Sequence, residues 1–274
     1  MTDEAHQPTP QPAGDLGTAS SQARVQFVGT GPGDPNLLTL GAVDAINRAQ
    51  VIVISYAEHR MLLGSDFLGL RPDVRIVLAG GVDEEAAVLP SQPGTGAPTP
   101  VDVDEHCADV TATVIDAASQ GLEVVRLVSG DPFLDGDIGA EAAAVARADY
   151  DVDVVPGVTG MTAVPEYAGL TLHGHDVQLI GDAACQRDIA GHGSNWSDQG
   201  LVVVNTEAGK LKEVVKHAIE SGRGEDEPAA LICHGATTQQ TTHTVTLGEL
   251  PQTAKTARLG DAEPVSYTHL TLPT

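Results

Sequence analysis

Residues 28–40 read VGTGPGDPNLLTL, a glycine-rich loop that joins an apolar strand to an apolar helical run. Glycine-rich loops in this position often hold phosphates. A Walker A loop ends in Gly-Lys-Ser/Thr, but no lysine follows here. A dinucleotide fingerprint requires Gly-x-Gly-x-x-Gly, but Asp34 stands at the third glycine position. Neither phosphate-binding motif is complete.

The loop is also chemically unsuited to phosphate. Asp34 would repel a pyrophosphate, and Pro32 and Pro35 remove two N–H donors that could bind one. The loop suits a close approach of the backbone to a less charged ligand. By itself, such a loop can also be only a tight turn between a strand and a helix.

Two other loops follow apolar strands in the same way. Residues 129–139 read SGDPFLDGDIG after an expected strand at 123–128, and residues 155–163 read VPGVTGMTA around the end of a strand at 152–157. Ligands of open α/β sheets gather at the carboxyl ends of the strands. Three such loops therefore predict a shared binding cleft.

Apolar strands alternate with helical segments along the body of the chain, which predicts an α/β fold with a largely parallel sheet. The expected strands are 25–29, 51–55, 75–79, 123–128, 152–157, 177–181, 201–205 and 229–235, and the expected helices are 37–49, 104–121, 139–148, 159–169 and 210–222. Residues 241–250 predict an antiparallel edge hairpin, and residues 183–200 predict a mobile loop.

A boundary near residue 150 divides the body into an N-terminal α/β part at 24–150 and a C-terminal α/β part at 151–262. Residues 1–23 are rich in Pro, Gln, Ser and Gly, and are expected to form a disordered tail. Residues 265–274 resemble a translated sequencing adapter, so we expect a non-native tail outside the fold. The natural protein would then continue past about residue 264; the alternative is a frayed genuine C-terminus.

The composition excludes several classes of function. A formal net charge of −24 argues against binding to nucleic acids or anionic membranes. No apolar run approaches the ~20 residues that span a bilayer. Three cysteines without a Cys-x-x-Cys pair, and the lack of a secretory signal, predict a cytoplasmic location. The histidines and cysteines match no zinc spacing, so no metal site is expected.

Four stretches together resemble the tetrapyrrole methylase family, the class III S-adenosylmethionine-dependent methyltransferases. They are VGTGPGDPNLLTLGA (28–42), VVRLVSGDPFLDG (124–136), VVPGVTGMTAVPEYAGLTL (154–172) and AALICHGATTQQTTHTVTLGEL (229–250). They follow the family's order and spacing and cover residues 24–250; the combination is specific, whereas each piece alone is not. The resemblance implies two α/β domains with the cofactor S-adenosyl-L-methionine in the cleft between them.

The resemblance also implies site residues. The expected cofactor contacts are Pro32, Gly130, Asp131, Leu134, Thr159, Gly160, Asn205 and Gly235, and the expected substrate contacts are Gly33, Asp34 and His175. Ser129 replaces the first glycine of the family's Gly-Gly-Asp, and Asn205 stands where the family usually has methionine. A zwitterionic sulfonium cofactor needs backbone amides and apolar walls but no phosphate cradle, which agrees with the chemistry of the first loop.

Three departures from the family concern residues expected near the substrate. The family's Tyr-Asp-Arg after the second strand is Ile-Ser-Tyr at 54–56, so Ser55 replaces the aspartate proposed as proton acceptor. Two glycines at 80–81 stand in place of an expected lysine, and His-Gly-His at 173–175 replaces Thr-His-Arg. No catalytic base is therefore assigned.

Within the family, the chain is most similar to the uroporphyrinogen-III C-methyltransferases, in a diverged actinobacterial form fused to a C-terminal uroporphyrinogen-III synthase. The resemblance implies a homodimer that methylates uroporphyrinogen III at C2 and C7 to precorrin-2, in the sirohaem and cobalamin branch of tetrapyrrole synthesis. Two alternatives stay open: a later precorrin C-methyltransferase, and a degenerate, non-catalytic domain that supports the fused synthase. The substrate carries eight carboxylates, and the expected local cations are Arg60, Arg126, His173, His175 and Arg187.

Overall fold

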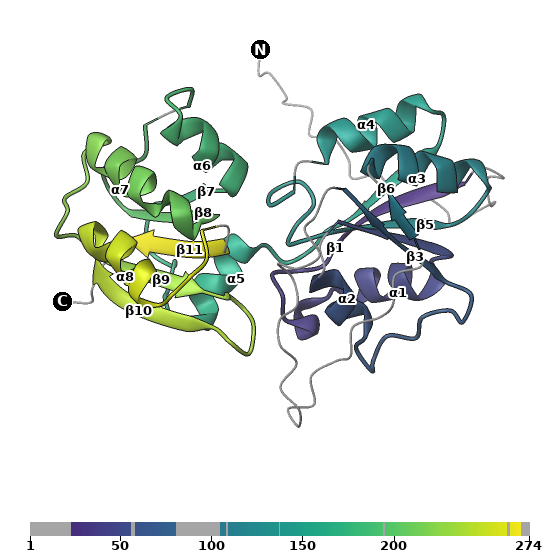
Figure 1. Cartoon of the computed structure of the whole chain (residues 1–274), viewed down its shortest axis with the longest axis horizontal. Helices are drawn as coiled ribbons and strands as arrows, with labels where there is room; N and C mark the ends of the chain where they lie inside the picture. The colour runs from purple at the N-terminus through teal and green to yellow at the C-terminus, as the bar shows by residue number, and fades with distance from the viewer. Residues whose placement is uncertain are drawn as a thin grey trace, which may run out of the picture.

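The computed structural model describes residues 23–55, 58–80, 105–107, 109–136, 138–193, 195–261 and 264–269. Two α/β subdomains follow each other along the chain and lie side by side in Figure 1. Helix α5 (Gly160–Tyr167) lies on the side of the second subdomain that faces the first. The expected disordered tail falls, except for Ala23, outside the described residues.

The first subdomain is built on a six-stranded sheet. Its strands, in spatial order, are β4 (Glu105–Cys107), β3 (Arg75–Ala79), β2 (Val51–Ile54), β5 (Val124–Val128), β1 (Arg24–Gly29) and β6 (Asp151–Val155). Its helices are α1 (Leu40–Arg48), α2 (Glu58–Leu63), α3 (Val110–Ser119) and α4 (Gly139–Arg147), and a 3-10 turn, η1 (Pro35–Leu37), precedes α1. All neighbouring strands in this sheet pair in parallel, as the sequence predicted.

Helices cover both faces of this sheet. In Figure 1, α3 and α4 lie on one face and α1 and α2 on the other. Successive residues of a strand point to opposite faces, so Phe27 joins the core under α3 and α4 whereas Val28 joins the core under α1. Every residue of β2 and β5 is buried, as expected for central parallel strands.

The second subdomain is built on a five-stranded mixed sheet. Its strands, in spatial order, are β10 (Thr241–Thr246), β9 (Pro228–Cys233), β11 (Pro264–His269), β8 (Leu201–Glu207) and β7 (Val177–Ile180). Its other helices are α6 (Asp182–Ile189), η3 (Ala208–Lys210), α7 (Leu211–Glu220), η4 (Leu247–Glu249) and α8 (Leu250–Thr256). Strand β10 is an antiparallel edge strand, as predicted for this stretch.

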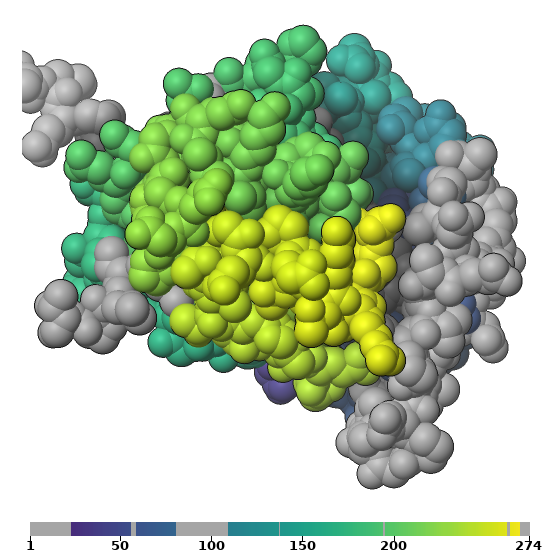
Figure 2. All heavy atoms as spheres, turned by 60° about the vertical axis from the view of Figure 1, so that its left-hand side comes forward, coloured from purple at the N-terminus to yellow at the C-terminus, as the bar shows by residue number. Residues whose placement is uncertain are grey.

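The second sheet is also covered on both faces. On the outer face, the larger core takes Cys185 from α6, Leu211 from α7 and Leu250 from η4–α8. On the face towards the first subdomain, Val164 of α5 packs against Ile232 of β9. Figure 2 is turned towards the outer face, and the second subdomain, coloured green to yellow, hides most of the first.

The structure differs from the sequence-based boundaries in three places. Strand β6 pairs with β1, so the first subdomain extends past the expected boundary at residue 150. Helix α6 lies within the expected loop at 183–200, and β4 lies where a helix was expected to begin at residue 104. Among the described residues, no helix is both long and apolar enough to cross a bilayer.

Strand β11 lies inside the second sheet, whereas residues 265–274 were expected to lie outside the fold. It pairs antiparallel with β8 on one side and β9 on the other. Val265 and Tyr267 point into the outer core, and Tyr267 is fully buried. The physical reason is the pattern of the stretch: Val265 and Tyr267 point to one face and Ser266 and Thr268 to the other, and β-branched and aromatic residues favour strands. The adapter origin of these residues stays a prediction.

Replacing Tyr267 by alanine tests whether β11 belongs to the folded sheet. Removing a large aromatic side chain from a core costs about 3–5 kcal/mol. The urea midpoint of Tyr267→Ala should therefore fall markedly, while Thr242→Ala, on an exposed position of β10, should leave it nearly unchanged. Equal midpoints for Tyr267→Ala and the unmodified chain would show that residues 264–269 do not form part of the sheet.

Candidate functional site

Three loops meet at the carboxyl edge of the first sheet, after the adjacent strands β5, β1 and β6. Gly29 ends β1, Gly130 follows β5 and Gly157 follows β6. A Cβ atom on Gly29 would lie 2.5 Å from the nitrogen of Gly157 and 2.7 Å from the oxygen of Gly130. A Cβ atom on Gly157 would overlap that same oxygen. Backbone packs on backbone at this junction, so only glycine fits at these two positions.

Hydrogen bonds join the first loop to the second. The Gly31 N–H donates to the Gly130 carbonyl at 3.2 Å, and the Gly130 N–H donates to the Gly31 carbonyl at 2.8 Å. The N–H of Thr30 donates to the carbonyl of Val128 at 2.8 Å. Gly31 and Gly130 adopt φ angles of +73° and +68°, a region that favours glycine. The sequence motif therefore builds a fixed junction between two loops.

Asp131 organises the second loop. One carboxylate oxygen accepts the N–H groups of Phe133 and Leu134 at 3.0 and 3.1 Å. The other oxygen accepts the N–H of Gly157 at 3.3 Å, which ties the second loop to the third. Asp131 was expected to contact the cofactor, and its observed bonds give it a role in holding the loop. Contact with the cofactor stays a prediction.

Asp135 links the same two loops. Its carboxylate accepts the N–H of Asp131 at 2.7 Å and the hydroxyl of Thr159 at 2.8 Å. Burial raises the pKa of Asp135, and these hydrogen bonds offset part of the rise. A Cβ atom on Gly130 would overlap the Asp135 carboxylate, so any side chain at position 130 would disrupt this link.

Gly160 lies where the third loop faces the second subdomain. It begins α5, and the hydroxyl of Thr159 caps this helix by accepting the N–H of Met161 at 3.2 Å. A Cβ atom on Gly160 would lie 3.5 Å from Cβ of Pro32 and 3.8 Å from Nδ2 of Asn205. Three expected cofactor residues from three different elements therefore surround one small space.

The first loop also reaches the second subdomain through Gly33 and Asp34. A Cβ atom on Gly33 would lie 3.1 Å from Cγ2 of Thr237 and 3.8 Å from the oxygen of Gly235. The hydroxyl of Tyr167, at the end of α5, donates to Asp34 at 2.9 Å. Partial burial acts to raise the pKa of Asp34, but hydrogen bonds from Asn36 and Tyr167 lower it overall. Asp34 is therefore a carboxylate tied to both subdomains.

His59 of α2 is a buried imidazole next to the first two loops. Its Nε2 lies 3.4 Å from the hydroxyl oxygen of Thr30 and 3.2 Å from that of Ser129. Burial lowers the pKa of His59 to about 3, and the positive charge of Arg126 acts in the same direction. His59 is therefore neutral at physiological pH.

The expected cofactor residues converge at this junction. Pro32, Gly130, Asp131, Thr159, Gly160, Asn205 and Gly235 lie on loops and strand ends that approach one another. Leu134 also faces the second subdomain, because its carbonyl oxygen would lie 3.6 Å from a Cβ atom on Gly181, at the start of α6. Their contact with a cofactor stays a prediction.

His175 is not brought to this junction. It lies in an exposed turn just before β7, which runs parallel to β8 with Val177 opposite Leu201. Asn205 lies nearer the other end of β8. His175 therefore lies towards the amino edge of the second sheet, away from the expected cofactor residues, and its role in substrate binding stays a prediction.

The other expected cations are placed differently from one another. Arg126 is buried in the first subdomain, where its Nε donates to Glu141 at 3.1 Å. It is therefore committed to an internal ion pair. His173 and Arg187 are exposed, and Arg60 is half-buried. Throughout the described part of the chain, no group of three or more His, Cys, Asp or Glu residues is arranged to hold a metal ion.

Sequence reasoning missed three of the residues that build this site: His59, Asp135 and Tyr167. Asp135 had a local signal, since it lies four residues after Asp131 in a turn-rich loop. His59 had none, because its partners lie 29 and 70 residues away in the chain. The oxygen of Ser55, which replaces the family's aspartate, is buried without a hydrogen-bond partner in the described residues.

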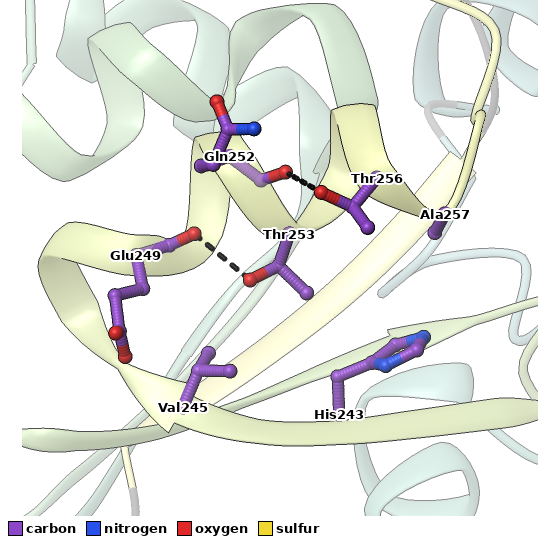
Figure 3. Close-up of a pocket in the computed structure, with 7 residues that line it drawn as sticks. All are labelled: His243, Val245, Glu249, Gln252, Thr253, Thr256 and Ala257. Carbon is purple, nitrogen blue, oxygen red and sulfur yellow. Dashed lines mark hydrogen bonds between the residues drawn. The ribbon is translucent and has the colours of Figure 1, made fainter.

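A separate cavity of about 290 Å³ lies between β10 and α8 in the second subdomain. It is lined by His243, Val245, Glu249, Gln252, Thr253, Thr256 and Ala257, with His243 and Val245 pointing from β10 towards α8 (Figure 3). The hydroxyls of Thr253 and Thr256 donate to backbone carbonyls one turn earlier in the helix, so these donors are already used. None of the expected site residues lines this cavity.

Acidification should destabilise the protein through His59. The pKa of His59 is about 3 in the folded chain, below the ordinary value of 6.5 that applies to the unfolded chain. Between pH 6.5 and pH 3 the unfolded chain therefore binds a proton at His59 that the folded chain does not. The contribution of His59 to stability therefore falls as the pH decreases from about 6.5 towards 3, and at pH 5 the loss is about 2 kcal/mol.

Urea unfolding at pH 7 and pH 5 measures this effect. The many carboxylates of the chain also titrate in this range, so the informative quantity is the difference between the unmodified chain and His59→Gln. The variant, which cannot bind the proton, should lose about 2 kcal/mol less on acidification. The same pH dependence in both proteins would contradict a neutral, buried His59.

The chain matches the family described as Tetrapyrrole (Corrin/Porphyrin) Methylases over residues 24–251. It is 31% identical over 237 residues to a uroporphyrinogen-III C-methyltransferase of Sinorhizobium sp, covering 84% of this chain and 77% of that protein. It is 33% identical over 236 residues to a siroheme synthase of Methylococcus capsulatus, covering 83% of this chain and 45% of that protein. The chain thus spans about half the length of the siroheme synthases that it matches.

Solved structures show the same fold. A cobalt precorrin-4 methyltransferase superposes with a TM-score of 0.66 at 19% identity, covering 92% of this chain and 98% of that one. A uroporphyrin-III C-methyltransferase from Thermus thermophilus superposes with a TM-score of 0.62 at 23% identity, covering 90% and 94%. The expected class III methyltransferase fold is confirmed. The match over residues 24–251 also confirms the expected family: the chain belongs to the tetrapyrrole (corrin/porphyrin) methylases.

Proposed function

We propose that this methyltransferase binds S-adenosyl-L-methionine between its two subdomains and methylates uroporphyrinogen III at C2 and C7, giving precorrin-2. The observation that carries the proposal is the convergence of Pro32, Gly160 and Asn205 around one space beside the three-loop junction. A uroporphyrin-III C-methyltransferase from Thermus thermophilus, of the same fold, has been solved with S-adenosyl homocysteine. The uroporphyrinogen-III C-methyltransferase of Sinorhizobium sp supports the enzyme class, an S-adenosylmethionine-dependent C-methyltransferase.

The residues at the junction fit a cofactor of this type. Between the ring of Pro32 and the amide of Asn205, Gly160 leaves a space in which a Cβ atom would sit at ordinary contact distance, with one apolar and one polar wall. The carboxylates nearest the loops, Asp131 and Asp135, are held by hydrogen bonds within the protein. Such a site suits a zwitterion with a cationic sulfonium centre better than a phosphate.

The chemistry asks mainly for alignment. When bound, the cofactor supplies a methyl group on a sulfonium, and this methyl group is readily transferred to a carbon nucleophile. The chain must hold that carbon in line with the methyl group and exclude water, and the loop junction and the Asp34–Tyr167 bond supply fixed walls for this purpose. No carboxylate stands at Ser55, so loss of the pyrrolic proton is not assigned to that position.

Two other functions are kept as candidates because specific observations favour them. A cobalt precorrin-4 methyltransferase shares this fold, which keeps a later precorrin as a candidate substrate. The serine at position 55 favours a domain that binds the cofactor without turnover. The expected homodimer, the C-terminal synthase and the cytoplasmic location also remain proposals, and light scattering on the purified chain tests the first of these.

Calorimetry with S-adenosylhomocysteine tests the cofactor site. Gly160→Ala places a methyl group at ordinary contact distance from its neighbours, so the fold should persist while the ligand space shrinks. Affinity should fall about tenfold, the usual scale for overpacking. Gly139→Ala is the matched control, because a Cβ atom at that helix start meets nothing within 4 Å. Equal affinity in all three proteins would place the ligand elsewhere, and no binding by the unmodified chain would refute the proposal.

Turnover separates the three functions. The chain is incubated with S-adenosylmethionine and either uroporphyrinogen III or precorrin substrates, and methyl addition is followed by mass spectrometry. We expect two methyl groups on uroporphyrinogen III. Methylation of a later precorrin alone would establish the second function, and cofactor binding without methylation of any substrate would establish the non-catalytic domain.

A further inference from the structure

His59 is a buried histidine beside the first two loops of the junction. It is not among the site residues that the resemblance to the family implies. Its side chain comes from α2, after β2, and is 2% exposed. Its Nε2 lies between Thr30 of the first loop and Ser129 of the second, at 3.4 and 3.2 Å. Thr30 is buried, whereas Ser129 is half-buried at the carboxyl end of β5. The imidazole is therefore buried next to the junction, and the Ser129 hydroxyl is on the more exposed of its two partners.

The positions of the hydroxyl protons follow from counting donors. Thr30 has one hydroxyl proton, and its oxygen lies 3.1 Å from the carbonyl of Val128 and 3.5 Å from that of Gly31. The shorter contact assigns the Thr30 proton to the carbonyl of Val128, which leaves the Thr30 oxygen as the acceptor towards the imidazole. The imidazole is then assigned the tautomer that carries its proton on Nε2. The same N–H then faces Ser129, whose oxygen accepts and whose own proton is free to point elsewhere.

The second loop needs such a donor, because its own amides are already used. The Gly130 N–H donates to Gly31, and the Asp131 N–H donates to Asp135. The amides of residues 133 and 134 donate to Asp131, and position 132 is a proline without an N–H. Along residues 130–134, the backbone thus offers no spare donor to a ligand. Ser129 adds one at the start of this loop.

We propose that Ser129 is a ligand-binding residue whose hydroxyl proton is directed into the cleft by the buried imidazole of His59, to bind a carboxylate of the ligand. This rests on the proposed function, which supplies two sources of carboxylate: the amino-acid end of the cofactor and the side chains of the substrate. His59 is a positioning residue. As a neutral imidazole it donates a hydrogen bond to Ser129 and adds no charge to the site. A glycine at position 129 would lack this hydroxyl.

Binding measurements with two nucleosides test the proposal. S-adenosylhomocysteine carries the amino-acid carboxylate, and 5′-methylthioadenosine lacks it. If the hydroxyl binds the cofactor, Ser129→Ala should weaken S-adenosylhomocysteine about tenfold and leave 5′-methylthioadenosine unchanged, because a hydrogen bond to a charged group is lost. If it binds the substrate, both affinities should stay constant and KM for uroporphyrinogen III should rise about tenfold with kcat little changed.

Variants of His59 test the coupling. His59→Phe removes the N–H and keeps a ring, so it should reproduce the effect of Ser129→Ala. His59→Gln keeps a neutral N–H donor and should restore affinity to within about threefold of the unmodified chain. The double variant His59→Phe/Ser129→Ala should bind no more weakly than either single variant, because both remove the same interaction. Ser119→Ala, at the exposed end of α3, is the matched control.

Three results would overturn the inference. One is unchanged binding and unchanged KM in Ser129→Ala. Another is an equal loss for both nucleosides, which would indicate a collapsed loop. The third is failure of His59→Gln to improve on His59→Phe. An unmodified chain that binds no S-adenosylhomocysteine would overturn the proposed function together with this inference, whereas normal binding with any of the three results would overturn the inference alone.

Discussion

The contact between Gly29, Gly130 and Gly157 is the constraint on which the candidate site depends. The loops that follow three adjacent parallel strands lie at one edge of the sheet, and their backbones pack there without side chains between them. A Cβ atom at Gly29 or Gly157 would force the loops apart, because the atoms that it meets belong to the backbone and cannot rotate away. The spacing of the site is therefore set by main-chain geometry.

Once the backbones are so close, the polar groups of the loops must be satisfied locally. Asp131 and Asp135 accept amides from their own loop, together with the Gly157 N–H and the Thr159 hydroxyl from the third loop. This explains how a chain with a net charge of −24 can place carboxylates beside a binding cleft. Hydrogen-bond donors of the protein meet their negative charge, and in Asp135 these bonds offset part of the rise in pKa that burial causes.

The sequence predicted the parts of the structure that are encoded in short stretches. The strands of the first sheet other than β4, the edge strand β10 and the convergence of the glycine loops all follow from local patterns. The boundary near residue 150 was misplaced, because β6 looks like any apolar strand and only its pairing with β1 assigns it to the first sheet. Helix α6 was missed because its apolar side is short, with Cys185 as its buried anchor.

The strand β11 was misassigned for a different reason. A composition break suggested foreign residues, but residues 264–269 contain β-branched and aromatic side chains that favour a strand, and they pair with both β8 and β9. A break in composition therefore does not show that a segment lies outside the fold. The His59 cluster could not be foreseen at all, since it joins residues from three elements separated by long stretches of chain. Contacts of this kind exist only after the sheet has formed.

The order of strands in the first sheet separates what the chain shares with its family from what it has changed. The matching loops follow β5, β1 and β6, beside the second subdomain. The departures at Ser55 and Gly80 follow β2 and β3, towards the other side of the sheet. Strands β2 and β5 are neighbours, and His59 and Ser129 bridge the segments that follow them. The hydrogen bond between His59 and Ser129 thus joins the loops that match the family to the segments that depart from it.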